Sequence, residues 1–231
     1  MRKKNPNDVI DDFKDLAADS LSAWTEMCGQ ISGNELKKNA SADAFLSVAI
    51  GWESFVSDWH IAAINRDSAA FAAGLQARVD ASLSGRGWTG LKGRVNLSIP
   101  KHPSLELVRE LIDPEGGNIS FGDKEKWRDR ARRELCDPYR AAILALNDRD
   151  HRLIRAVVAV RDCIAHRSKK ASDAMNGALA LLASADSALR RSHARVQPSG
   201  IGAYLYAQAG ARRRVELYHQ RLGEIAEKLR V

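Results

Sequence analysis

Apolar residues recur at three- and four-residue spacing along most of this chain, and this periodicity limits what it can fold into. Runs of β-branched residues that alternate with polar ones, the pattern of a half-buried strand, are nearly missing. The spacing predicts helices over about 8–31, 41–65, 68–82, 104–112, 122–135, 138–146, 148–168, 172–196 and 204–229. We therefore predict an all-α fold, a helical bundle.

The second of these helices has the strongest core character. Ser41 is placed as its N-cap. Its aromatic residues cover more than one face of the helix, which is typical of a helix at the centre of a bundle. These residues are Phe45, Trp52, Phe55 and Trp59.

The helical pattern breaks in a long glycine-rich loop, which begins at residue 84 and reaches about Pro100 or Pro103. A short strand over 95–99 is a further expectation. Basic residues interleaved with one tryptophan suit single-stranded RNA, whose bases stack while its phosphates are neutralised. The candidate RNA contacts here are Arg86, Trp88, Lys92 and Arg94. The alternative is that Trp88 packs onto the bundle.

Several classes of protein are excluded by what the sequence lacks. No apolar run approaches ~18 residues, so we expect no membrane-spanning helix. A charged N-terminus without a following apolar segment indicates no secretory signal. The three cysteines, Cys28, Cys136 and Cys163, are far apart, which argues against a disulfide framework and a cysteine-based zinc site and fits a reducing cytoplasm.

The remaining composition bears on ligands. Among the histidines, His102, His151, His193 and His219 show no metal-ligand spacing, so we expect no metal and no cofactor. A net charge of +7 permits a polyanionic partner such as RNA without requiring one.

The helix over 148–168 holds the residues with the clearest chemistry. At about 100° per residue, one face is apolar and predicted to enter the core, and the opposite face is polar. The core face comprises Leu153, Val157, Val160 and Ile164; the other comprises His151, Arg155, Val158, Asp162 and His166. Arg161 lies about 140° from His166.

These side chains supply the parts for phosphodiester chemistry. Histidine exchanges protons near neutral pH, arginine binds a phosphate through two parallel hydrogen bonds, and a carboxylate orients an imidazole. On these residue types alone, a solvated charged face is the better explanation of Arg161, Asp162 and His166.

The run Arg161-Asp162-Cys163-Ile164-Ala165-His166 has the form R-x-x-x-x-H, with a polar residue directly after the arginine. It ends an apolar-periodic helix in an all-α chain, and it resembles the motif of HEPN domains, the higher-eukaryote-and-prokaryote nucleotide-binding helical bundles. The aromatic helix near residues 45–59 and the stretch 118–121 resemble RiboL-PSP-type HEPN proteins. The resemblance covers roughly 41–193. It suggests an N-terminal helical extension over 1–40, a HEPN-like bundle with a long glycine-rich loop over 41–196, and a C-terminal helix over 197–231.

The resemblance implies a metal-independent endoribonuclease that acts as a homodimer, with two motif helices forming one composite cleft. Arg161 would bind the scissile phosphate, and His166 would handle the proton of the 2′-hydroxyl or of the leaving 5′-oxygen. Asp162 would orient one of these two residues. Attack by the 2′-hydroxyl would leave a 2′,3′-cyclic phosphate. Arg155 and Arg167 are further candidate RNA contacts.

The family also bears on biological role. Its members include toxins and antiphage defence effectors, so an antitoxin or regulatory protein partner is an expectation here. Some members carry a tyrosine two residues after the histidine as an AMPylation target, which Ser168 disfavours. A non-catalytic HEPN module that binds a nucleotide or a protein is one alternative. A generic helical nucleic-acid binder, with strongly salt-dependent affinity, is another.

Three further features leave alternatives open. Glu53 either lines the cleft or makes a salt bridge inside the bundle. Cys163 is either a small packed residue or an exposed nucleophile. Two arginine clusters without nearby acids are either phosphate contacts or plain basic surface: Arg190, Arg191 and Arg195, and Arg212, Arg213 and Arg214.

Overall fold

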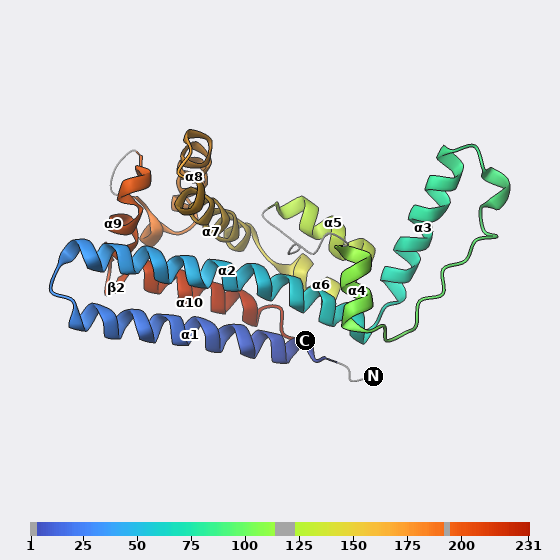
Figure 1. The fold of residues 1–231 in the computed structure, drawn as a ribbon, viewed down its shortest axis with the longest axis horizontal. Coiled ribbons are helices and arrows are strands. Elements are labelled where there is room, and N and C mark those ends of the chain that lie inside the picture. The colour runs from blue at the N-terminus through green and yellow to red at the C-terminus, as the bar shows by residue number, and fades with distance from the viewer. Residues whose placement is uncertain (1–3, 114–122, 192–194) are drawn as a thin grey trace. The chain divides into compact units, whose positions relative to one another are not determined.

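The computed structural model describes residues 4–113, 123–191 and 195–231, and over these ranges the chain is all-α apart from one two-stranded sheet (Figure 1). Its α-helices are α1 (Pro6–Gln30), α2 (Asn34–Arg66), α3 (Ala69–Gly85), α4 (Leu105–Ile112), α5 (Lys124–Glu134), α6 (Tyr139–Ala145), α7 (Asp148–His166), α8 (Lys169–Ala183), α9 (Ile201–Tyr206) and α10 (Arg214–Glu227). Short 3-10 helices are η1 (Thr89–Leu91), η2 (Ser187–Leu189) and η3 (Pro198–Gly200), and the strands are β1 (Gln208–Ala209) and β2 (Arg212–Arg213). The all-α prediction is confirmed.

Two compact units divide the chain. The first, called unit 1, comprises 1–9, 56–145 and 229–231, and the second, unit 2, comprises 10–55 and 146–228. Residues 40 and 41 both lie within α2. The three-part division suggested by the sequence stays a prediction.

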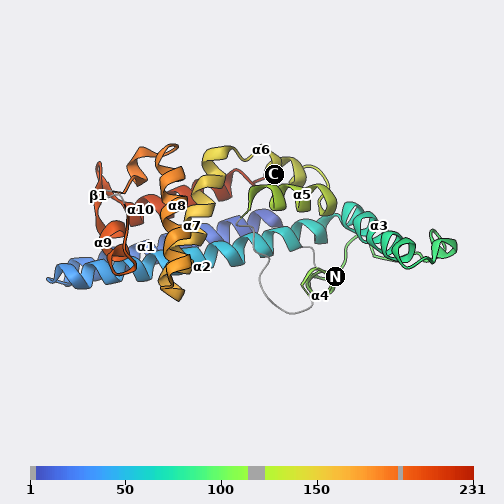
Figure 2. The ribbon, with the colours of Figure 1, turned by 90° about the horizontal axis from the view of Figure 1, so that it is seen from above.

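Unit 1 is organised around the C-terminal part of α2. The buried Trp59 ring meets the Tyr139 ring edge-on at 6.0 Å, and the His60 imidazole hydrogen-bonds to the Glu134 carboxylate at 2.9 Å. After α3 the chain turns through η1 and runs back along that helix (Figure 2). This returning segment is not the strand expected over 95–99. Instead the Gln76 side chain bonds to the carbonyl of Val95 and the backbone N–H of Leu97, so a side-chain amide replaces a neighbouring strand.

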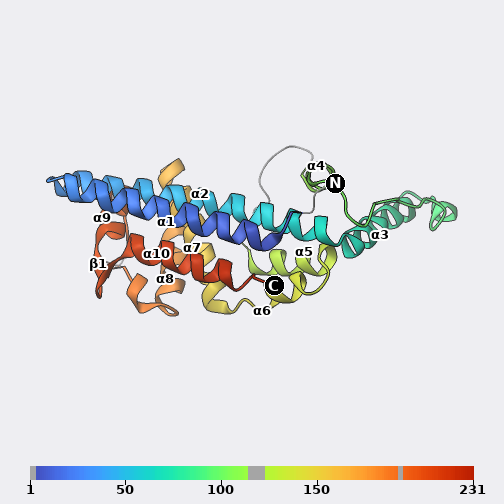
Figure 3. The same ribbon diagram turned by 90° about the horizontal axis from the view of Figure 1, so that it is seen from below.

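Unit 2 combines most of α1 and the N-terminal part of α2 with α7–α10. The Phe13, Trp52 and Phe55 rings form an aromatic cluster with centroid separations of 4.8–5.5 Å. Further along, the Phe45 ring meets the buried Tyr218 ring of α10 edge-on at 5.0 Å. Helix α10 lies beside α1 (Figure 3), and the two are linked by an ion pair between Lys14 and Glu227.

The start of α2 differs from the prediction. The helix begins at Asn34, and Ser41 is buried within it rather than capping its N-terminus. The Ser41 hydroxyl donates to the Lys37 carbonyl one turn earlier and accepts from the Trp24 indole N–H at 2.9 Å. A serine that bonds back to position i−4 fits inside a helix, so residue type alone misplaced this boundary.

The last two predicted helices are shorter than expected. Helix α8 ends at Ala183 instead of continuing to residue 196. The helix predicted over 204–229 is interrupted between Tyr206 and Arg214 by the β1–β2 hairpin, where Gly210 adopts φ +68°. A positive φ is easily adopted only by glycine and ends helical geometry.

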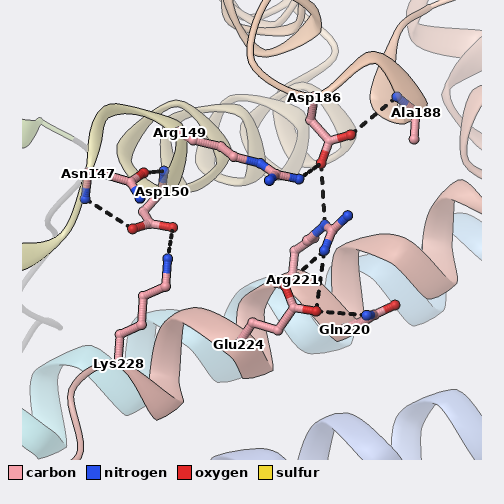
Figure 4. Close-up of polar contacts among 9 residues, drawn as sticks. All are labelled: Asn147, Arg149, Asp150, Asp186, Ala188, Gln220, Arg221, Glu224 and Lys228. Carbon is pink, nitrogen blue, oxygen red and sulfur yellow. Dashed lines mark hydrogen bonds and ion pairs between the residues drawn. The ribbon is translucent and has the colours of Figure 1, made fainter.

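An ion-pair network joins α7, α10 and the turn after α8 within unit 2 (Figure 4). The buried Asp186 carboxylate accepts from the Arg149 guanidinium at 2.7 Å and pairs with the Arg221 guanidinium at 3.3 Å. It also accepts from the backbone N–H of Ala188, in the short helix η2 that follows it. Asp186 is thus an ion-pair partner and a helix cap at once.

The start of α7 is held in a similar way. Asn147 and Asp150 form a reciprocal capping box, in which each side chain accepts from the other residue's backbone N–H. The second Asp150 oxygen accepts from the Lys228 ammonium at 2.7 Å. These bonds set the position of α7 within unit 2.

We expect Asp186→Asn to lower the free energy of unfolding by about 2 kcal/mol, because it removes a buried carboxylate from two arginines. Asp129→Asn is the matched control, since its ion pair with Arg132 is exposed and contributes less than about 1 kcal/mol. Urea denaturation of both variants measures the difference. Equal losses would contradict a stabilising role for the network.

A second prediction concerns pH. His219 is buried, its Nδ1 bonds to the Val215 carbonyl at 2.9 Å, and burial lowers its pKa below the ordinary 6.5. The unfolded chain therefore takes up a proton at a higher pH than the folded chain does. The contribution of neutral His219 to the free energy of unfolding is complete above pH 6.5. It is lost as the pH falls through the pKa of His219 in the folded protein.

Denaturation at about pH 7.5 and about pH 5.5 should show this loss for the wild-type protein, and a smaller loss for His219→Gln. His60, whose pKa burial also lowers, contributes in the same direction in unit 1 and remains in both proteins. An unchanged pH dependence in His219→Gln would show that His219 is not responsible.

Candidate functional site

Helix α7 presents its motif residues at its C-terminal end. Leu153, Val157 and Val160 are buried as predicted, and Ile164 is half-buried. His151 differs from the prediction, because it is buried rather than available beside Asp162 and His166. In the N-terminal half of α7, residues outside the predicted core face are buried as well, among them Asp150 and Ile154. Arg155 in the N-terminal half is exposed, and in the C-terminal half His166 is exposed while Arg161 and Asp162 are half-buried.

Arg161 is held between two carboxylates. One terminal nitrogen, Nη2, donates to Glu53 of α2, and the other, Nη1, pairs with Asp162 at 2.8 Å. The side chains of Arg161, Glu53 and Asp162 are 25%, 18% and 39% exposed. We call this trio the arginine clamp. The salt-bridge alternative for Glu53 is confirmed.

The clamp leaves the guanidinium with donors to spare. Arginine has five N–H groups in a planar fork, and one on each terminal nitrogen is used here. Arg161 Nε is buried and has no hydrogen-bond acceptor among the described residues. Two carboxylates beside one guanidinium give the trio a net charge of about −1. This local charge opposes the approach of a phosphate.

His166 is the last residue of α7 and is exposed. Arg167 then adopts a left-handed conformation with φ 47°, which ends the helix, and Ser168 caps α8 through a bond to the Ala171 N–H. The imidazole therefore lies at the tip of the α7–α8 hairpin. No hydrogen bond joins it to Asp162 within the described part of the chain, so this carboxylate orients the arginine and not the imidazole.

The other predicted RNA contacts are all exposed. Arg155 and Arg167 belong to unit 2, as the motif does. The loop residues Arg86, Trp88 and Lys92, with Arg94, belong to unit 1. The alternative in which Trp88 packs onto the bundle is wrong, because this residue is 55% exposed.

The stretch 118–121 and His193 lie outside the described residues.

Cys163 is not an exposed nucleophile. It is fully buried on the core face of α7, and burial raises the pKa of its thiol. Among residues 4–113, 123–191 and 195–231, no three histidine, cysteine or acidic side chains are placed to hold a metal ion. Within the same ranges, no helix is both long and apolar enough to cross a bilayer.

Comparison of this chain with protein-family models, with curated proteins and with solved structures gives no match. The case for a function therefore rests on the residues and their geometry.

Arg161, Asp162 and His166 stay predicted site residues, and the sequence did not identify Arg161 as the partner of Glu53. The two residues are 108 positions apart, and no local spacing rule joins them. The sequence signal was an acidic side chain directly after Trp52, among the aromatic residues of α2. Such a residue needs a polar partner, although the sequence does not say which one.

We expect Glu53→Gln to destabilise the protein by about 1 kcal/mol, because a neutral amide replaces a charged acceptor of Arg161. Glu35→Gln is the matched control, since Glu35 is exposed and pairs with Lys38 three residues later. Chemical denaturation compares the two. A Glu53→Gln protein as stable as the control would mean that Glu53 does not hold Arg161 in place.

Proposed function

We propose that this chain is a HEPN-type, metal-independent endoribonuclease. The observation that best supports the proposal is the end of α7, where an exposed His166 follows a half-exposed Arg161 on one rigid helix. A histidine and an arginine, the two residue types that phosphodiester cleavage needs, are therefore both held on α7 and accessible to a ligand.

In the proposed reaction the 2′-oxygen of a ribose attacks the adjacent phosphorus, and the bond from phosphorus to the 5′-oxygen breaks. One imidazole takes the 2′-hydroxyl proton, and another gives a proton to the leaving 5′-oxygen. Arg161 stabilises the charge that develops on the phosphate oxygens. The products are a 2′,3′-cyclic phosphate and a 5′-hydroxyl, with no change of oxidation state.

This scheme requires two chains. Arg161 and His166 point about 140° apart on one helix, so a single α7 does not direct both at one phosphate. We propose a homodimer in which two α7 ends meet and each contributes one imidazole. The exposure of His166 leaves it available for such a contact.

The arginine clamp has a role in this proposal. Glu53 and Asp162 hold the guanidinium in position before RNA binds, and the second N–H of each terminal nitrogen meets the phosphate. A nuclease of this kind would harm the cell that makes it. We therefore propose a cytoplasmic toxin or antiphage effector, kept silent by an antitoxin or another regulatory protein.

A second candidate is favoured by the same clamp. Two carboxylates around Arg161 reduce its attraction for a phosphate and are also what a purely structural arginine would have. In a non-catalytic module, this end of α7 would bind a nucleotide or a protein without cleaving RNA.

The test is cleavage of labelled RNA in the presence of EDTA. We expect Arg161→Ala and His166→Ala each to lower the cleavage rate by about 10²- to 10⁴-fold, because each removes transition-state stabilisation or proton transfer. Arg132→Ala, an exposed arginine of α5, is the control and should cleave normally.

Two results would contradict the nuclease proposal. One is cleavage that persists in both motif variants, which would indicate another site or a contaminant. The other is a light-scattering mass of one chain under conditions where RNA is cleaved, which would exclude the composite site. RNA binding without any cleavage would favour the non-catalytic module.

A further inference from the structure

A basic hollow lies within unit 2, away from the motif in sequence. It has a volume of about 620 Å³ and is formed by the turn at η2, the tip of the β1–β2 hairpin and the start of α10. Its lining residues are Ser187, Ala188, Arg190, Arg191, Ala209, Gly210 and Arg214. Three of these are arginines and none is acidic. The fold thus brings together members of the two arginine clusters.

Arg214 is the unusual member of this group. It is only 7% exposed, and its guanidinium donates to the Tyr204 carbonyl at 3.1 Å and to the Arg190 carbonyl at 2.6 Å. Its Nε is buried without an acceptor. Among the described residues no carboxylate oxygen lies within ion-pair distance of it. Arginine does not lose its proton in proteins, so a buried positive charge remains uncompensated.

The neighbouring phenols do not supply the missing negative charge. The Arg214 guanidinium lies 4.9 Å from the centre of the Tyr204 ring, and the Tyr204 hydroxyl bonds to that of Tyr218. Burial raises the pKa of Tyr204 to about 12 and that of Tyr218 well above its ordinary value. Both phenols are therefore neutral at physiological pH, and the Tyr204 side chain attracts the cation through its aromatic face and not through a charge.

The other two arginines of the hollow, Arg190 and Arg191, add positive charge, and in the described part of the chain they bring no carboxylate partner with them. Arg191 donates to the carbonyl and to the side-chain oxygen of Asn176, which are both neutral acceptors. Arg190 is exposed, and its side chain makes no hydrogen bond or ion pair within the described ranges. The acid nearest to Arg190 and Arg191 along the chain, Asp186, is already bonded to two other arginines (Figure 4). Glu216, two residues after Arg214, accepts from the backbone N–H of Arg213.

We propose that this hollow binds a phosphate group, either of an RNA backbone or of a small phosphate ester. A buried uncompensated guanidinium provides a fixed positive potential, and the free Arg190 supplies a planar pair of donors for an oxyanion. The bound anion would offset the repulsion among the three cations. The hollow would bind phosphate whether or not α7 cleaves RNA.

The test compares Arg190→Gln with Arg132→Gln, which removes the same charge from an exposed arginine of α5. Both substitutions leave buried contacts intact, so both proteins should fold. The first probe is a fluorescent 2′-O-methyl oligonucleotide of about 12 nucleotides, long enough to fill a typical single-strand site. It lacks the attacking hydroxyl and stays intact even if the chain is a nuclease.

We expect Arg190→Gln to weaken oligonucleotide binding by about three- to tenfold and to reduce the slope of log affinity against log salt by about 0.7, the value for one single-strand phosphate contact. The control should bind as the wild-type protein does. The second probe is inorganic phosphate, at an ionic strength matched with chloride. It should raise the melting temperature of the wild-type and control proteins by about 2–4 °C, and that of Arg190→Gln by less.

The two probes separate the two sources of phosphate. An effect of Arg190→Gln on both supports an RNA phosphate site, and an effect on inorganic phosphate alone supports a small phosphate ester. The proposal is overturned if Arg190→Gln matches the control with both probes. Because neither probe can be cleaved, this result is independent of whether the nuclease proposal survives.

Discussion

The bond between Arg161 and Glu53 is the contact on which the candidate site depends. It ties the accessible end of α7 to α2 within unit 2, and it fixes the guanidinium that would meet a phosphate. Asp162 holds the same group from the other side. A clamped arginine needs little reorganisation to bind a ligand, but its carboxylate partners compete with that ligand for its charge. If the fixed position of the guanidinium outweighs this competition, the site suits catalysis. If the competition dominates, it suits a non-catalytic binding module.

Charge is balanced very differently elsewhere in unit 2. Around Asp186 and Asp150, buried carboxylates are matched by Arg149, Arg221 and Lys228, and this arrangement stabilises the start of α7 and the turn after α8 (Figure 4). Around Arg214 no such match exists among the described residues. Matched buried charges are typical of structural networks, whereas an unmatched one needs another explanation, and a bound anion is the simplest.

Most of the helices could be predicted from the sequence because their apolar periodicity is local. The errors fall where a tertiary or side-chain contact overrides a local signal. Ser41 has the residue type of a cap, but its hydroxyl satisfies a carbonyl and an indole inside α2. Val95 and Leu97 have strand-like composition, but their backbone groups bond to the Gln76 side chain. The Trp24 indole and the Gln76 amide come from other segments of the chain, so the local pattern does not encode these partners.

The sequence by itself determined the all-α class, the apolar face of α7 and the presence of Arg161, Asp162 and His166 near its end, because helix period and residue chemistry act over a few positions. Only the tertiary structure decided that Glu53 meets Arg161, that His151 is buried, and that Arg190, Arg191 and Arg214 line one hollow. The physical reason is that burial and ion pairing depend on which distant segments pack together, and no single-residue spacing specifies this.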